Sequence, residues 1–154
     1  MNKKIVVIII LSILILICSI FIFFMVKKDK VSNKDIIMNA KNIEIRFTYS
    51  SMIKPVVYEI TINNDVATLE TSSFDEIIDK RDLSREEVDI IKQALIEGDV
   101  ISWDGFYKSD PDVLDGASFS LILKIDDRNI SAHGDNSWPN NYHKFRDLFY
   151  KVVK

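Results

Sequence analysis

The stretch SFSLILKIDDRNISAH, residues 118–133, decides the fold of this chain. Its first half places apolar side chains at every second position, which is the pattern of a strand with one buried face. These apolar side chains are Phe119, Leu121, Leu123 and Ile125. The polar run 126–129 predicts a turn, and 130–133 predicts a returning strand. Because strands joined by a tight turn pair antiparallel, the stretch predicts a hairpin in an antiparallel sheet.

A second hairpin is predicted earlier in the chain. Residues 43–49 and 58–62 both alternate apolar with polar side chains, and Pro55 separates them. The Asn-Asn-Asp segment at 63–65 is a turn, since Asn and Asp tolerate left-handed backbone, and 66–71 runs back to form the hairpin with 58–62.

Two amphipathic helices accompany these strands. Ser84 and Glu87 form a capping box ahead of an apolar face, and Gly98 is a natural stop. Pro139 precedes the last helix, which carries a wide apolar stripe of Tyr142, Phe145, Leu148, Phe149, Val152 and Val153. The predicted order is β-β-β-α-β-β-α. This order favours an α+β fold, a two-layer sandwich in which both helices cover one face of an antiparallel sheet.

Outward from the domain, the N-terminus carries an apolar run from Ile5 to Val26, 22 residues without a charge. A helix of this length spans about 33 Å, enough to cross a bilayer. We therefore divide the chain into a basic tip and membrane anchor at 1–26, a polar stalk at 27–41 and a soluble domain at 42–154. Within the stalk, the apolar residues 36–38 predict a short helix packed on the domain.

The anchor is expected to remain uncleaved, because the run is too long for a secretory signal and shows no cleavage site. Lipidation of Cys18 is disfavoured, since Ile17 precedes it and the apolar run continues beyond it. Orientation rests on two opposed signals. Flanking lysines are more numerous on the C-terminal side, which favours a cytoplasmic domain, whereas a short basic start before a long apolar run favours export. We expect the domain to lie outside the cytoplasm.

The net charge of the domain limits the classes of partner that it is expected to bind. Residues 31–154 hold 15 Lys or Arg and 22 Asp or Glu, a net charge of −7. Nucleic-acid affinity comes mainly from neutralising phosphates, so an acidic domain is a poor nucleic-acid binder. Anionic lipid headgroups should repel it as well. The membrane contact expected from the sequence is therefore the N-terminal helix alone.

A metal site is one candidate function of the second half. Asp110, Asp112 and Asp115 alternate ahead of Gly116, as oxygen ligands and glycine do in calcium loops. The spacing does not match the EF-hand pattern, and no glutamate follows at the closing position. An ordinary acidic turn entering the next strand is therefore the favoured explanation of the segment, and no cofactor is expected.

Aromatic and polar loop residues are the other candidates, because binding residues collect on loops held by a scaffold. Trp103 beside Asp104, with Trp138 elsewhere, would offer a sugar or peptide platform, although such rings more often plug the end of a small core. His133 and Asn136 complete the set of candidate binding residues. No motif of the HExxH or GxSxG type is present. The 22 acidic residues of the domain would supply a pair of carboxylates for glycoside hydrolysis, but no spacing identifies such a pair.

The segment 115–142 carries a recognisable end-piece: Asp115-Gly116, Phe119-x-Leu121, then Gly134-x-Asn136-x-Trp138-Pro139 and a helix bearing Tyr142. It resembles the C-terminal part of small uncharacterised bacterial domains found behind lipoprotein signals or single anchors. This chain departs from that pattern by its anchor and by Asp-Arg-Asn at 127–129, where a turn glycine is usual. The resemblance implies an extracytoplasmic domain and no activity. Independently, Gly134 can adopt a positive φ.

Together these features favour a non-enzymatic interaction or binding module, single-pass in the membrane, that meets an envelope protein or cell-wall partner. The alternative is a small envelope enzyme or calcium-dependent binder using the Asp110–Asp115 loop.

Overall fold

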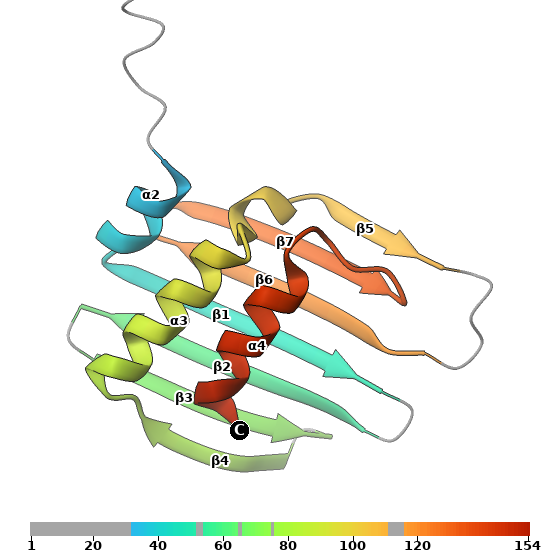
Figure 1. Ribbon diagram of the computed structural model, residues 1–154. Helices are drawn as coiled ribbons and strands as arrows, with labels where there is room; N and C mark the ends of the chain where they lie inside the picture. Colours follow the sequence, from blue (N-terminus) through green and yellow to red (C-terminus); the bar gives the residue numbers. More distant parts are fainter. Residues whose placement is uncertain (1–31, 52–53, 65, 75, 111–115) are drawn as a thin grey trace, which may run out of the picture. The chain divides into compact units, whose positions relative to one another are not determined.

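The computed structural model describes residues 32–154 apart from 52–53, 65, 75 and 111–115. Asn33–Lys154 forms one compact unit. Its elements, shown in Figure 1, are α2 (Asn33–Asn39), β1 (Asn42–Ser50), β2 (Pro55–Asn63), β3 (Val66–Ser73), β4 (Glu76–Asp82), α3 (Arg85–Glu97), the 3-10 helix η1 (Val100–Trp103), β5 (Phe106–Ser109), β6 (Ser118–Ile125), β7 (Arg128–Asp135) and α4 (Tyr142–Val153).

The seven strands form one mixed sheet with the order β4-β3-β2-β1-β6-β7-β5. Neighbouring strands run antiparallel, except that β5 runs parallel to β7. The two predicted hairpins are present as β2–β3 and β6–β7, and β1 pairs antiparallel with both β2 and β6. The prediction of a purely antiparallel sheet in the order β-β-β-α-β-β-α is wrong, because it lacks β4 and β5 and misses the parallel pair.

Both missed strands lie at the edges of the sheet, and that position explains why their sequences give no strand signal. Edge strands are often short, charged or bulged, and such sequences show no clear alternation. In β4 almost every residue is exposed, and a bulge opposite Thr71 and Ser72 breaks the register. β5 is only four residues long and pairs with β7 from Phe106↔Ala132 to Ser109↔Asp135.

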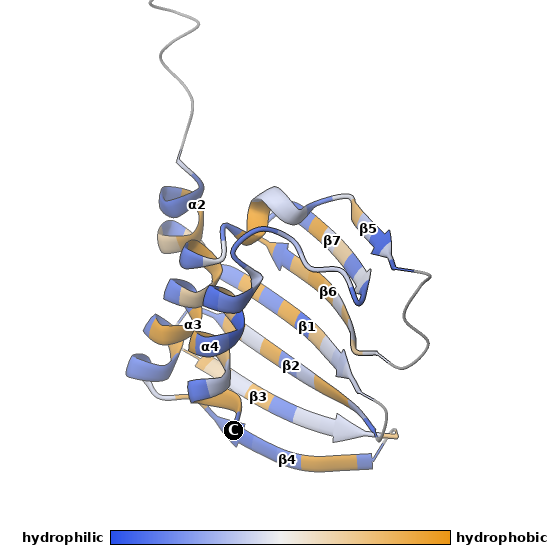
Figure 2. Ribbon diagram, turned by 45° about the vertical axis from the view of Figure 1, so that its right-hand side comes forward, coloured by the Kyte–Doolittle hydropathy of each residue, from blue (hydrophilic) through white to orange (hydrophobic). Residues whose placement is uncertain are grey.

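Helices cover one face of the sheet, as Figures 1 and 2 show. The sequence predicted two helices on the domain, whereas α2 adds a third. The short helix expected around 36–38 is thus present, and its Ile37 is 1% exposed. Isolated helices of this length are marginal in water, so burial of Ile37 against the core stabilises α2.

The start of α3 confirms the predicted capping box. Glu87 N–H donates to Ser84 Oγ, and Ser84 N–H donates to Glu87 Oε2 at 2.8 Å. The bond from the Ser84 backbone and the hydrogen bond from Arg81 lower the pKa of the Glu87 carboxyl. At the other end, Gly98 has φ −71°, so it is not a left-handed stop; Asp99 takes that conformation with φ 48°. Gly98 instead allows the end of α3 to lie close to α4, since a Cβ at position 98 would lie 2.7 Å from Phe145 Cβ.

The core lies between the sheet and the helices. Its largest fully buried side chains are Trp103, Tyr142, Phe47, Phe119, Phe145 and Phe149. Their rings meet mostly edge-on, for example Phe47 and Phe149 with centroids 5.3 Å apart. Edge-to-face pairs of this kind add to the stabilisation from burial itself.

The predicted membrane helix, 5–26, lies outside the described residues. Within the described part, none of the helices has the length and apolar character needed to span a bilayer.

Candidate functional site: the open sheet face

One face of the sheet carries no helix in the described part of the chain (Figures 1 and 2). We call it the open sheet face. Because side chains alternate along a strand, the residues between the core positions point to it. On the central strands these residues include Glu44, Arg46, Thr48, Val57, Glu59, Thr61, Ser118, Ser120, Ile122, Lys124, Asn129, Ser131, His133 and Asp135.

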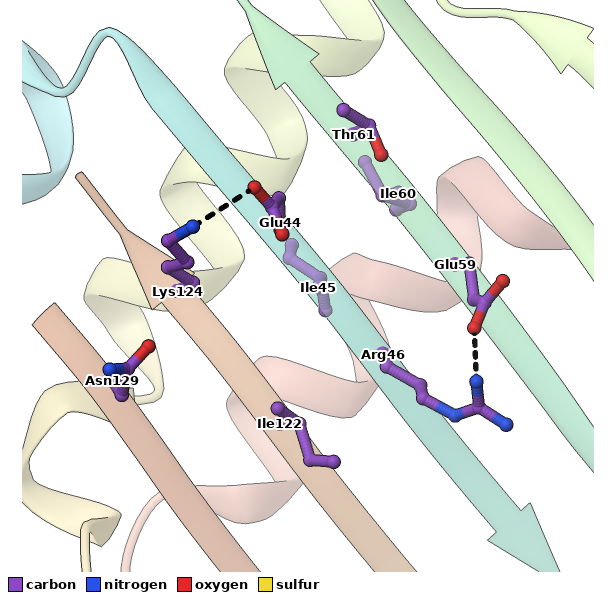
Figure 3. A pocket seen from close by; sticks show the side chains of 9 residues that line it. All are labelled: Glu44, Ile45, Arg46, Glu59, Ile60, Thr61, Ile122, Lys124 and Asn129. Carbon is purple, nitrogen blue, oxygen red and sulfur yellow. Dashed lines mark hydrogen bonds and ion pairs between the residues drawn. The ribbon is translucent and has the colours of Figure 1, made fainter. Parts of the chain in front are cut away.

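The charged side chains at the centre of this face are paired across strands. Lys124 Nζ lies 3.5 Å from Glu44 Oε1, and Arg46 Nη1 donates to Glu59 Oε1 (Figure 3). Both pairs connect residues that face each other in the strand register. Each pair is well exposed to solvent and adds little stability. Their effect is to leave the centre of the face electrically neutral in an otherwise acidic domain.

A third pair continues this row toward the β4 edge. Lys80 Nζ donates to Glu70 Oε2 at 2.9 Å. This hydrogen bond raises the pKa of the Lys80 amino group, and the charge of Glu70 acts in the same direction. The paired charges therefore extend from β6 across β1 and β2 to β3 and β4.

Ile122 interrupts this polar surface. Its side chain is 54% exposed although both neighbours along β6, Leu121 and Leu123, are buried. Figure 3 shows it beside Arg46, at a depression of about 270 Å³ that the two central ion pairs also line. Pockets that enclose small molecules usually have about 300–1,000 Å³ and bury most of the ligand. This shallow, open depression fits a larger partner better than an enclosed small molecule.

Hydroxyl and imidazole groups occupy the other end of the open sheet face. Tyr107 Oη donates to Ser131 Oγ at 2.6 Å, and His133 Nε2 lies 3.2 Å from Asp135 Oδ2. Tyr107 and His133 are partners in the β5–β7 register, and Ser120 faces His133 from β6. Tyr107 is 61% exposed, so this end also presents an aromatic ring to solvent.

Two of the predicted binding residues lie at this end. His133 is on the open sheet face itself. Asp104 lies at the sheet edge where β5 begins, and its Oδ1 accepts a hydrogen bond from Ser131 N–H at 3.0 Å. Gly105 N–H donates to the Ser131 carbonyl in the same place. Asp104 therefore secures the start of β5 against β7.

Of the other three predicted binding residues, Trp103 and Trp138 lie on the helix side of the sheet. Trp103 is 1% exposed, and its Nε1–H donates to the Asn140 carbonyl at 3.1 Å. Trp138 is half-buried, and its ring stacks on Phe119 with centroids 5.5 Å apart. Trp103 is therefore a core residue, whereas Trp138 covers the core and keeps part of its ring exposed.

Asn136 joins the end of β7 to the start of β6. Its Oδ1 accepts from Ala117 N–H at 2.9 Å, and its own N–H donates to the Ala117 carbonyl. Asn136 has φ 50°, whereas Gly134 is not among the residues with positive φ. The expectation of a left-handed Gly134 is wrong, because the left-handed residue of this loop is Asn136. Asn tolerates that conformation, and its side chain accepts the hydrogen bond from Ala117 that joins the end of β7 to the start of β6.

For the predicted metal site, the structure places one of the three aspartates. Asp110 is exposed, and its N–H donates to the Asp135 carbonyl. Asp112 and Asp115 lie outside the described residues. Among the residues that are described, no group of three His, Cys, Asp or Glu could hold a metal ion.

Several residues of this face were missed by the sequence reasoning. Ile122 had a visible signal, since it is an apolar side chain at a polar position of an alternating strand. The pairing of Arg46 with Glu59 had none, because it depends on the register between β1 and β2.

Comparison with known proteins adds no family: no family model matches the chain, and no curated protein matches it either. The resemblance of the segment 115–142 to bacterial extracytoplasmic domains stays a prediction. Function is therefore inferred from the chemistry of the surfaces.

Proposed function

We propose that this chain is a membrane-anchored, non-enzymatic interaction module of the cell envelope, and that it binds a protein partner through the open sheet face. The observation that carries the proposal is the exposed Ile122 among mutually paired charges, on the sheet face that none of the described helices covers. Protein interfaces combine apolar contacts at the centre with a polar rim. A neutral face also lets a partner approach an acidic domain without strong repulsion.

The proposed location rests on the N-terminal sequence. The run Ile5–Val26 is long enough to span a bilayer, and the short basic tip before it favours export of the domain. With a stalk of this length, the interaction would take place close to the membrane surface.

The location has a direct test. Protease added to intact protoplasts should digest residues 31–154, because we expect them outside the cytoplasm. Detergent lysis in parallel shows whether the protease can cleave the domain at all. A domain that resists digestion until the cells are lysed would place it in the cytoplasm.

The binding surface is tested by changing Ile122. We expect Ile122→Lys to reduce recovery of the partner by about tenfold or more, which corresponds to about 1.4 kcal/mol. The substitution should leave the melting temperature nearly unchanged, since the side chain is exposed. A photocrosslinker at position 122 in the full chain, followed by mass spectrometry, identifies the partner in intact cells.

Met38→Lys is the matched control, because Met38 is 48% exposed and lies on α2, in the helical layer. It introduces the same charge away from the open sheet face. If both variants recovered as much partner as the parent protein does, Ile122 would not be part of the interface.

A further inference from the structure

The strand β4 forms an edge of the sheet and carries exposed apolar side chains. In the described part of the chain, no strand pairs with its outer side (Figure 1). Seven large apolar side chains are exposed in this part of the chain, and three of them, Phe74, Ile77 and Ile78, lie on β4 or in the turn before it. An unpaired strand edge with exposed apolar residues is a template for pairing with another strand.

The pairing of β4 with β3 shows which backbone groups point away from the sheet. Leu83 N–H donates to the Ala67 carbonyl at 2.8 Å, and β4 keeps this register from Asp82 back to its bulge. In an antiparallel pair, residues bonded to the neighbouring strand alternate with residues whose backbone groups point away from it. The N–H and C=O groups of Lys80 and Asp82 therefore point outward. A long contact of 3.4 Å from the Arg81 guanidinium reaches the Asp82 carbonyl and leaves its second lone pair available.

The bulge in β4 separates an irregular first half of the strand from a regular second half. Thr71 faces Asp79 and Ser72 faces Ile77, so Ile78 is the extra residue. The side chains of Ile77 and Ile78 are 60% and 64% exposed. Because a bulge bends the strand locally and leaves its extra residue unpaired, the backbone that can accept a further strand is the regular half that ends at position 82.

We propose that this regular half pairs antiparallel with the same segment of a second copy of the chain, around a two-fold axis at Arg81. In this register Lys80 of each copy lies opposite Asp82 of the other, so the two residues whose backbone groups point outward bond to each other. Their side chains have opposite charges, and both are exposed in the single chain. Lys80 already donates to Glu70, but an ammonium group has further donors for the Asp82 carboxylate.

The same register gives the exposed isoleucines a contact. With Arg81 opposite itself, Ile78 of one copy lies opposite Ser84 of the other. Ser84 adjoins a depression of about 200 Å³, which is lined by Asn64, Ala67, Leu83, Arg85, Val88 and Asp89. The apolar side chain of Ile78 in each copy therefore meets the apolar part of this depression in the other copy. A two-fold interface repeats every contact, so two isoleucines and two depressions are used.

A second copy fits this edge better than an unrelated strand, because β4 itself contains both members of the charged pair and the depression follows it directly in the chain. A two-fold axis between antiparallel edge strands runs perpendicular to the sheet. The helices of both copies therefore lie on one side, and the two open sheet faces continue into each other. The dimer uses the β4 edge alone and does not depend on the protein partner proposed for the open sheet face.

Sedimentation velocity of the full chain in a mild detergent, over a dilution series, tests the proposal. We expect a dimer that dissociates on dilution. Ile78→Lys should raise the Kd of the dimer by about tenfold or more, equivalent to about 1.4 kcal/mol. Met38→Lys should leave the Kd unchanged, because Met38 is an exposed residue of α2. A monomeric parent protein would overturn the proposal, and so would an Ile78→Lys variant that dimerises like the parent, since the dimer would then form through another surface.

Cysteine crosslinking tests the register while Ile78 stays in place. Two differently tagged full chains, both with Cys18→Ser, carry either Lys80→Cys or Asp82→Cys and are mixed in detergent with a mild oxidant. Opposed residues of a hydrogen-bonded antiparallel pair have Cα atoms about 5.5 Å apart, which suits a disulfide. We expect at least about fivefold more crosslinked dimer in the mixture than with either variant alone, in which the cysteines are offset by two positions. Equal crosslinking in all three samples, or none in the mixture, would contradict pairing around Arg81.

Discussion

Replacing Gly134 with alanine is expected to destabilise the domain by about 4 kcal/mol or more, the range reached by severe steric or packing defects. A Cβ at this position would overlap the carbonyl oxygen of Ser137 and lie 2.7 Å from Phe119 Cε1. The first of these atoms belongs to the backbone of the loop that leads to Trp138, so it cannot rotate away. Denaturant unfolding followed by circular dichroism measures the loss.

Gly105→Ala separates this steric effect from backbone strain. Gly105 has φ 76°, but a Cβ there would meet no atom within 4 Å. Its replacement should cost only about 1–2 kcal/mol, the penalty of a left-handed conformation for an L-residue. If the two variants were equally stable, the close approach of Ser137 to Gly134 would not be a feature of the folded protein.

The second large effect is expected at Trp103. Trp103→Ala should cost about 3–5 kcal/mol, because it empties a fully buried site and leaves the Asn140 carbonyl without its donor. Its ring packs edge-on against Phe145 at 5.4 Å and Phe119 at 6.1 Å, so no flexible neighbour fills the cavity.

Trp138→Ala is the matched comparison, with an expected loss of roughly 1–2 kcal/mol, since less apolar area is removed from water at a half-buried ring. Thermal melting of the two variants in parallel shows which substitution causes the larger loss of stability. Equal losses, or a larger loss at Trp138, would reverse the assignment of Trp103 to the core and Trp138 to its cover.

The candidate surfaces were only partly predictable. Asp104 and Trp103 are adjacent in the sequence and were expected to act together, but η1 ends between them and directs them to different partners. Asp104 bonds the backbone of β7 at the sheet edge, whereas Trp103 enters the core. The contact between Tyr58 and Tyr150 was also not predicted, because it forms only when α4 packs over a strand from far earlier in the chain.

The sequence by itself determined the features that depend on neighbouring residues. Alternation and turn residues predicted the hairpins β2–β3 and β6–β7, because a strand with one buried face must repeat every second residue. Ser84 and Glu87 identified the start of α3, because a capping box needs only a four-residue segment.

Tertiary structure decided what depends on contacts between distant segments. The strands β4 and β5 exist because β3 and β7 offer them free edges, not because their sequences alternate. Gly134 is needed for its missing Cβ and not for a positive φ, since the obstacle is the backbone of Ser137. The neutral open sheet face arises from pairs such as Glu44 with Lys124, 80 residues apart. Strand register brings such charges together, and register is set by the whole buried face of the sheet.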